Sequence, residues 1–146
     1  MTSWEWSDAG SPADIVEIES VDLKPDPPRK GEIVRATIPA HVSATINRGA
    51  RVEVTVQIGL IKLLTKTYDL LERMRDGDPA GGDWTLTVDT ASAGEPVPPG
   101  NAVLTLAVNL PAQIPPAKFH VVIRAYNDDD ADLFALDLNV DFSDRF

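Results

Sequence analysis

The sequence predicts an all-β protein, an antiparallel sandwich of about seven strands. Short runs of alternating apolar and polar residues recur along the 146 residues. This period of two turns one face of each strand to a core and the other to water. Turns rich in Pro and Gly separate the runs every ten to fifteen residues or so, which is typical of a sandwich. No long stretch has the 3.6-residue period of an amphipathic helix.

Three strands are expected in the first part of the chain. Residues 15–23 are rich in Ile and Val and end at the rigid Pro25–Pro28 segment, where proline cannot donate ladder hydrogen bonds. Residues 33–38 form the second run, and Pro39 indicates an edge position or a bulge there. The clearest alternation lies at 51–58, where four aliphatic residues alternate with polar ones.

The middle of the chain is less regular. Gly59 ends the third strand, and a denser apolar patch follows at 60–64. Residues 68–74 are expected to make one or two helical turns before the Asp-Gly-Asp-Pro turn at 76–79 stops them.

Four more strands are expected in the second half, at 84–88, 104–110, 119–126 and 133–142. A loop rich in Pro and Gly fills 91–100. Since neither an internal repeat nor a change of composition divides the chain, we expect one domain over residues 1–146.

Charge and composition exclude several classes of function. The 13 basic residues are outnumbered by 23 acidic ones, giving a net charge of −10. This disfavours nucleic acid as a partner and also a lasting attachment to anionic membrane, while a local basic patch leaves transient membrane contact open. The chain has no cysteine and begins without a secretory signal pattern, which together favour a cytoplasmic location. The alternative is a secreted or vacuolar protein seen as a trimmed mature chain.

No constellation of residues predicts catalysis, a metal or a cofactor. His41 and His120 lack metal-ligand spacing, and His120 is expected to point outward from its strand. The acidic turn Asp128–Asp130 lacks the spaced ligands of a calcium loop. Neither a Ser–His–Asp order nor a Gly-rich phosphate loop is present. We therefore expect a protein that is not an enzyme, and a hydrolase acting on lipids ranks last among the functions considered.

Several segments, taken in order, resemble a known family. They are Trp6–Gly10, Ser20–Pro28, Gly59–Leu64, Tyr68–Leu70, Leu110–Phe119, Arg124–Asn127 and Asp132–Leu136. The chain resembles the ML lipid-recognition family, and within it the fungal phosphatidylglycerol/phosphatidylinositol transfer proteins; the sterol carrier of Niemann–Pick type C disease belongs to the same family. The resemblance implies an immunoglobulin-like sandwich with an apolar cavity between two sheets. It also implies a lipid ligand, either a phospholipid or a sterol, and no cofactor.

The departure from the family lies in its disulfides. The resemblance matches Ala9 and Ala135 to one pair of family cysteines, and Leu71 and Glu95 to another. Each bridge is lost at both ends. Because losing a disulfide typically costs about 2–5 kcal/mol, packing must supply that stability here.

The expected lipid site combines the inward strand faces with residues at an entrance. It consists of Val54, Val56, Ile58, Leu60, Leu63, Tyr68, Leu104, Leu106, Val108, Phe119, Val121, Ile123, Leu136, Leu138 and Val140. From the residues alone, such faces more often fill a closed core, and it is the resemblance that favours a cavity. The segment 114–118 is expected to flank the entrance, where Lys62, Lys66 or Lys118 would meet a phosphate headgroup or remain an ordinary solvated charge.

Two functions follow as hypotheses. The first is non-catalytic binding and transfer of a lipid held between the sheets. The second is a non-enzymatic interaction module that kept the sandwich but closed its cavity and binds protein through a sheet face or edge. The oligomeric state stays open.

Overall fold

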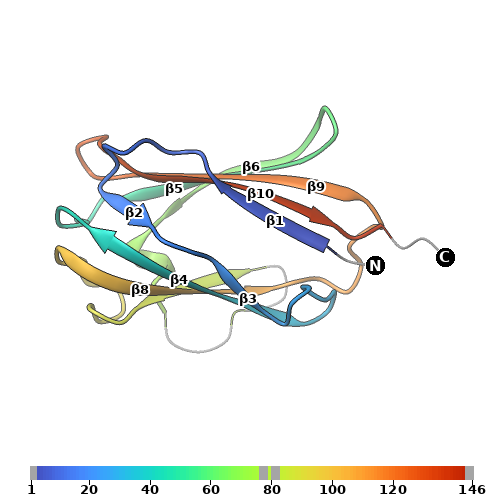
Figure 1. Ribbon diagram of the computed structural model, residues 1–146, viewed down its shortest axis with the longest axis horizontal. Helices are drawn as coiled ribbons and strands as arrows, with labels where there is room; N and C mark the ends of the chain where they lie inside the picture. The colour runs from blue at the N-terminus through green and yellow to red at the C-terminus, as the bar shows by residue number, and fades with distance from the viewer. Residues whose placement is uncertain (1–2, 76–78, 80–82, 144–146) are drawn as a thin grey trace.

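Two antiparallel sheets make up the computed structural model, which describes residues 3–75, 79 and 83–143 (Figure 1). Ten strands occur in this part of the chain. Sheet 1 has the order β1 (Ser3–Asp8), β10 (Asp132–Asp141), β9 (Lys118–Tyr126), β5 (Arg51–Ile58) and β6 (Ile61–Asp69). Sheet 2 has the order β2 (Val16–Ile18), β4 (Ile33–Val42), β8 (Gly100–Asn109) and β7 (Trp84–Val88), and β3 (Asp22–Lys24) also pairs with β4.

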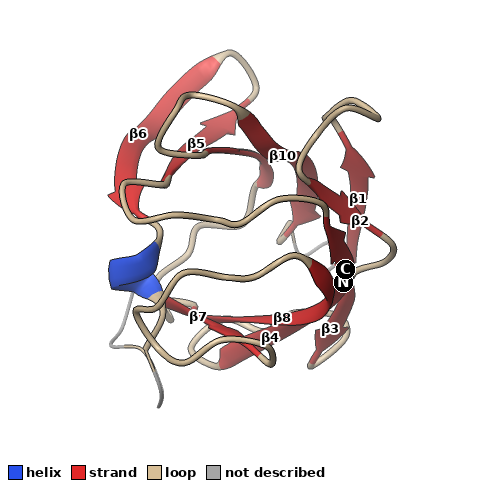
Figure 2. Ribbon diagram, turned by 90° about the vertical axis from the view of Figure 1, so that its left-hand side faces the viewer, coloured by secondary structure: helices blue, strands red, loops and turns tan. Residues whose placement is uncertain are grey.

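The sheets form two layers, as Figure 2 shows with β5, β6 and β10 in one layer and β4, β7 and β8 in the other. The all-β sandwich expected from the sequence is therefore confirmed, with ten strands in place of about seven. The segment 15–23 divides into β2 and β3, which pair with different parts of β4.

The helical expectation at 68–74 is largely wrong. Tyr68 belongs to β6, and the only helix among the described residues is η1 (Leu71–Arg73), a single 3₁₀ turn. Leu71 is buried, as are Leu70 and Met74 on either side, so this segment packs into the apolar core. The turn expected at 76–79 lies outside the described residues except for Pro79. None of the described helical structure has the length and apolar character needed to cross a membrane.

The fully buried core is concentrated at one end of the sandwich, the end opposite the chain termini (Figure 1). There Val42 on β4, Val52 on β5 and Leu133 on β10 are almost completely buried. Asn127 holds this end together as a buried polar residue. Its side-chain oxygen accepts the N–H of Asn47 at 3.0 Å, and its amide donates to the carbonyl of Thr45 at 3.0 Å.

The positions matched to family cysteines lie close together in space. The N–H of Ala9 donates to the carbonyl of Ala135 at 3.0 Å, directly beyond the β1–β10 ladder. A side chain built on Gly94, next to Glu95, would lie 3.9 Å from the backbone carbonyl of Leu71. Both lost bridges therefore map onto neighbouring backbone segments, as the resemblance requires.

Candidate functional site

The inner face of sheet 1 is a continuous apolar surface made by cross-strand neighbours. Residues directly opposite one another in an antiparallel ladder share a face. Three such rows cross β5, β9 and β10: Val54, Ile123 and Leu136; Val56, Val121 and Leu138; Ile58, Phe119 and Val140. The structure thus brings these nine predicted residues onto one surface.

The facing surface comes from sheet 2. Leu104, Leu106 and Val108 on β8 lie opposite three residues of β7 and three of β4. Those neighbours are Trp84, Leu86 and Val88 on β7, and Val34, Ala36 and Ile38 on β4. Sequence reasoning named the β8 residues but missed the β4 and β7 ones, although the alternation in both segments was visible.

Burial of the inner face falls along β5, β9 and β10 toward the end that carries the termini. Val52 and Ala125 are buried, whereas Val54, Val56 and Ile58 on β5 and Ile123, Val121 and Phe119 on β9 are only partly buried. The same change occurs on β10 after Leu136 and on β8 after Leu104. Because side chains in a closed core interlock at crystal-like density and lose nearly all contact with solvent, the partial exposure indicates that this part of the inner face of sheet 1 is less tightly covered.

Exposure also rises across sheet 1 toward its edge strand, β6. Ile61 faces the same side as Ile58 and is 66% exposed, and Leu64 faces the same side as Val56 and is 43% exposed. The inner face of β6 therefore extends past the cover of sheet 2. We call this uncovered edge of sheet 1 the open edge.

Two residues expected at the entrance lie on the hairpin rather than between the sheets. Leu60 occupies the turn between β5 and β6 and is fully exposed. Gly59 precedes it with a φ of 59°, as a two-residue hairpin turn with Gly in first position requires. Leu63, 52% exposed, is the extra residue where the register shifts opposite Val56 and Gln57. Neither lines the surface between the sheets.

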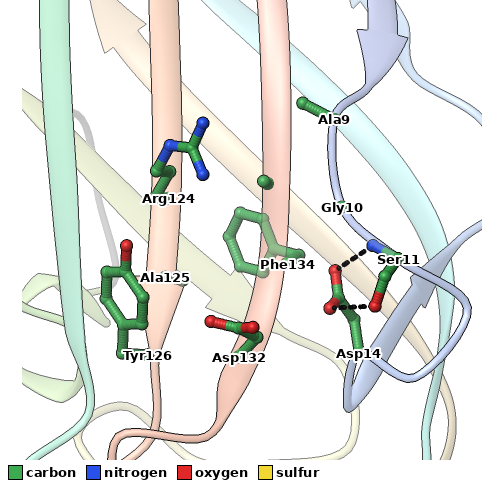
Figure 3. A pocket seen from close by; sticks show the side chains of 10 residues that line it. Ala9, Gly10, Ser11, Asp14, Arg124, Ala125, Tyr126, Asp132 and Phe134 are labelled. Carbon is green, nitrogen blue, oxygen red and sulfur yellow. Dashed lines mark hydrogen bonds between the residues drawn. The ribbon is translucent and has the colours of Figure 1, made fainter.

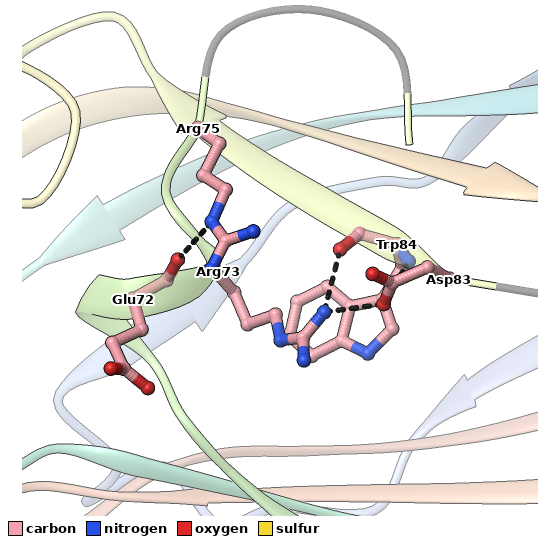
Figure 4. Close-up of polar contacts among 5 residues, drawn as sticks. All are labelled: Glu72, Arg73, Arg75, Asp83 and Trp84. Carbon is pink, nitrogen blue, oxygen red and sulfur yellow. Dashed lines mark hydrogen bonds and ion pairs between the residues drawn. The ribbon is translucent and has the colours of Figure 1, made fainter. Parts of the chain in front are cut away.

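A cluster of rings and charges joins the two sheets at the open edge. The rings of Tyr68 on β6 and Trp84 on β7 meet edge to face at 5.2 Å. The guanidinium of Arg73 lies 4.6 Å from the Tyr68 ring and 5.6 Å from the Trp84 ring, and it pairs with the carboxylate of Asp83. Figure 4 shows Arg73 reaching both Asp83 and the carbonyl of Trp84. These four residues, the edge cluster, join the two sheets at one part of the open edge. The part of β6 that precedes Tyr68 stays exposed.

Other contacts bound the inter-sheet space on the remaining sides. On the β1 side, the indole N–H of Trp4 donates to the carboxylate of Asp26 at 2.8 Å, joining sheet 1 to the loop after β3. At the terminal end, the buried ring of Phe142 meets that of Phe119 at 6.0 Å. At the packed end, Phe134, Leu104 and Met74 are among the apolar residues around a small hollow of about 10 Å³, which has room for at most one water molecule.

The predicted headgroup lysines differ in placement. Lys66 lies opposite Val54 on the inner side of β6, and its ammonium is 5.0 Å from the Tyr68 ring. Lys62 lies opposite Gln57 on the outer side of the same strand. Lys118 lies opposite Asp141 in the β9–β10 ladder at the terminal end, where hydrogen bonds from Ser143, with a smaller contribution from Lys118, lower the pKa of Asp141. Only Lys66 is therefore on the face that continues into the inter-sheet space.

A larger hollow, of about 190 Å³, lies elsewhere and is polar (Figure 3). It is formed by the loop after β1 and the adjoining parts of β9 and β10, including Ser11, Asp14, Arg124 and Asp132. The Asp14 carboxylate accepts hydrogen bonds from the backbone N–H and the hydroxyl of Ser11 at 3.1 and 3.2 Å. Its charged lining does not suit an alkyl chain, so we do not assign the lipid to it.

His120 and the acidic turn are placed as the sequence predicts. His120 lies opposite Gln57, on the outer side of sheet 1, 3.7 Å from the carboxylate of Asp137. Asp130 pairs with Arg51 at 2.7 Å and closes the turn between β9 and β10. No group of three or more His, Asp or Glu side chains in the described part of the chain is arranged to hold a metal ion.

Comparisons with known proteins agree with this architecture. A family model described as the ML domain matches residues 3–142. The phosphatidylglycerol/phosphatidylinositol transfer protein of Cryptococcus neoformans var. neoformans serotype D is 41% identical over 140 residues, which cover 96% of this chain and 71% of that protein. The protein of the same name from Mycosarcoma maydis is 32% identical over 142 residues, covering 97% and 67%.

Two solved structures share the fold. A Niemann-Pick type C2 protein from the Japanese carpenter ant superposes with a TM-score of 0.62 at 8% identity, over 92% of this chain and 96% of that one. Chicken MD-1 complexed with lipid IVa superposes with a TM-score of 0.52 at 12% identity, over 95% and 98%. At these identities the likeness extends to the fold alone.

Proposed function

The chain belongs to the ML domain family, and from this membership we propose that it binds one phospholipid between its two sheets and transfers it without chemical change. The observation that carries the proposal is the set of aliphatic inner faces that stay partly exposed at the terminal end of the sandwich. Two relatives with at least 32% identity are named as phospholipid transfer proteins, and the MD-1 fold holds lipid IVa.

The energetics favour an acyl chain as the buried part of the ligand. Each methylene removed from water contributes about 0.8 kcal/mol, so a long chain needs no polar contact to be held. The inner faces of β5, β9 and β8 offer only aliphatic and aromatic groups at the open end. An acyl chain lying there would cover apolar surface that is otherwise exposed to water.

The headgroup would remain at the open edge. There Lys66 and Arg73 both lie against the Tyr68 ring, which places two cations where an acyl chain would leave the sandwich. Since Arg73 is already paired with Asp83, Lys66 is the better placed of the two to meet a phosphate. A phospholipid therefore suits the edge better than a sterol, whose single hydroxyl has no charge.

A pair of tryptophan variants tests the site. Ile123→Trp puts an indole on the inner face between β5 and β10, so uptake of a fluorescent phospholipid should fall at least tenfold. Val122→Trp makes the same change one residue away, on the outer side of β9 opposite Thr55, and should leave uptake within about twofold of the unmodified chain. Thermal unfolding of each variant checks that both fold.

Two outcomes would overturn the proposal. One is an unmodified chain that takes up no phospholipid and carries none in native mass spectrometry. The other is uptake that survives Ile123→Trp in a folded protein. Either result would favour the interaction module with a closed cavity.

A further inference from the structure

The large aliphatic side chains that the described residues leave exposed all lie on one hairpin. They are Leu60, Ile61, Leu63 and Leu64, at the turn between β5 and β6 and in the first half of β6. Figure 1 shows this hairpin standing out from the sandwich at its terminal end. A group of four exposed aliphatic residues on a projecting element marks an interaction site, because isolated proteins seldom leave such a patch in water.

The charge on the hairpin is opposite to that of the whole chain. Lys62 and Lys66 are the only charged residues between Glu53 and Asp69, within a chain of net charge −10. Their long stems allow the ammonium groups to reach outward while the aliphatic parts lie along an apolar layer. The net negative charge of the chain opposes approach to an anionic surface, whereas the two lysines favour approach through this hairpin.

The shape of the patch selects the partner. A projecting turn with a fully exposed leucine at its apex can be buried only by a partner that accommodates a protruding side chain. The interfacial region of a bilayer does this without a preformed groove. The inner face of the same hairpin, at Ile61 and Leu64, continues into the inter-sheet surface at Ile58 and Val56. A docked hairpin would thus bring the open edge to the place where acyl chains are found.

We propose that residues 59–66 form a membrane-docking element that inserts Leu60 and Leu63 into the surface of an anionic bilayer, with Lys62 and Lys66 meeting lipid phosphates. The docking itself follows from the hairpin; its use in loading a lipid rests on the proposed function. The path for an acyl chain then runs over Ile61 and Leu64, along the open edge.

Flotation with vesicles tests the docking. The full chain should bind vesicles of phosphatidylcholine with about 30% phosphatidylglycerol more tightly than vesicles of phosphatidylcholine alone, and the difference should shrink as salt is raised. The double variant L60D/L63D should bind the anionic vesicles at least tenfold more weakly. The double variant K62Q/K66Q should lose most of the preference for anionic vesicles.

Two controls separate docking by the hairpin from a general effect of added negative charge and from lipid uptake. T90D/S92D adds the same two charges to exposed residues of the loop between β7 and β8, at the packed end, and should bind vesicles like the unmodified chain. Val56→Trp, on the inner face, should block lipid uptake and leave docking intact, so failure of docking and failure of the lipid site are distinguishable.

Two results would overturn the docking element. One is equal vesicle binding by L60D/L63D and the unmodified chain. The other is a dimer in analytical ultracentrifugation that L60D/L63D converts to a monomer, with no vesicle binding by either, which would make a second copy of the chain the partner of the hairpin.

Discussion

At the scale of the residue, Asn127 is a buried polar side chain that connects distant segments at the packed end. It is buried, and it satisfies backbone groups of Thr45 and Asn47, some 80 residues earlier in the chain. Since the chain has no disulfide, such long-range hydrogen bonds connect segments that would otherwise be held only by apolar packing. Each buried backbone group left without a partner costs about 1–3 kcal/mol.

Asn127→Ala should therefore lower the free energy of unfolding by about 2–3 kcal/mol. Chemical denaturation measures this change. Asn139→Ala, at an exposed position of β10, is the matched control and should alter stability by no more than about 0.5 kcal/mol. Equal effects of the two substitutions would show that the Asn127 bridge does not contribute to stability.

Individual residues were predicted well where the strand period is regular and poorly where it is not. The alternation of 51–58 and 119–126 correctly orients Val54, Ile123 and His120. The apolar patch at 60–64 has no such alternation, and the register shifts beside Leu63, which changes the face of the residues that follow. Nothing in a single sequence marks where one strand gains an extra residue.

At the scale of the element, the two edge strands of sheet 1, β1 and β6, were the least visible in the sequence. β6 is exposed along nearly its whole length. Its sequence therefore lacks the alternation of polar and apolar residues that identifies a strand with one buried face. On the inner face of β1, Trp4 and Trp6 are followed by the charged Asp8, so the apolar pattern is short. Central strands such as β4, buried at every second residue over most of its length, leave a clearer pattern.

The pairing of β1 with β10 predicts that a lost bridge can be restored. Ala9 and Ala135 are joined by a backbone hydrogen bond, and residues opposite each other in an antiparallel ladder have Cα atoms about 5.5 Å apart, within the range a disulfide spans. A9C/A135C should oxidise to a disulfide and gain about 2–4 kcal/mol of stability. Thermal unfolding with and without a reductant measures the gain.

The single variant A9C is the control, because it cannot form the intramolecular bridge and should show no dependence on reductant. If A9C/A135C stays reduced in air, the two positions do not lie opposite each other and the match to the family cysteines is wrong.

At the scale of the whole molecule, the inner face of sheet 1 is buried at the packed end and partly exposed at the terminal end. The sequence predicted that the inner faces exist and which residues of sheet 1 form them. It did not predict where along the strands the packing loosens, because that depends on how far sheet 2 extends beneath β6 and on which loops cap each end. The cytoplasmic location and the expected site residues stay predictions.

The difference between the two ends predicts how lipid changes stability. A ligand that binds only the folded chain stabilises it by about 2.7 kcal/mol when its concentration is 100 times the Kd. For a chain of this size that corresponds to a rise in Tm of about 5–10 °C. Hydrogen exchange should locate the effect, with new protection in Val54–Ile58 and Phe119–Ile123 and little change near Val52 or Ala125, which are already buried.

The variant pair on β9 makes this prediction specific to the inner faces. With Ile123→Trp the phospholipid should no longer raise Tm, whereas with Val122→Trp the full rise should remain, because only the first substitution fills the space between the sheets. A rise in Tm that is equal in both variants, or protection confined to strands other than β5 and β9, would mean that the lipid binds a surface other than the open end. Since the docking hairpin and the inner faces share β5 and β6, protection that spreads from Ile58 into Ile61 and Leu64 would show that both act on the same bound lipid.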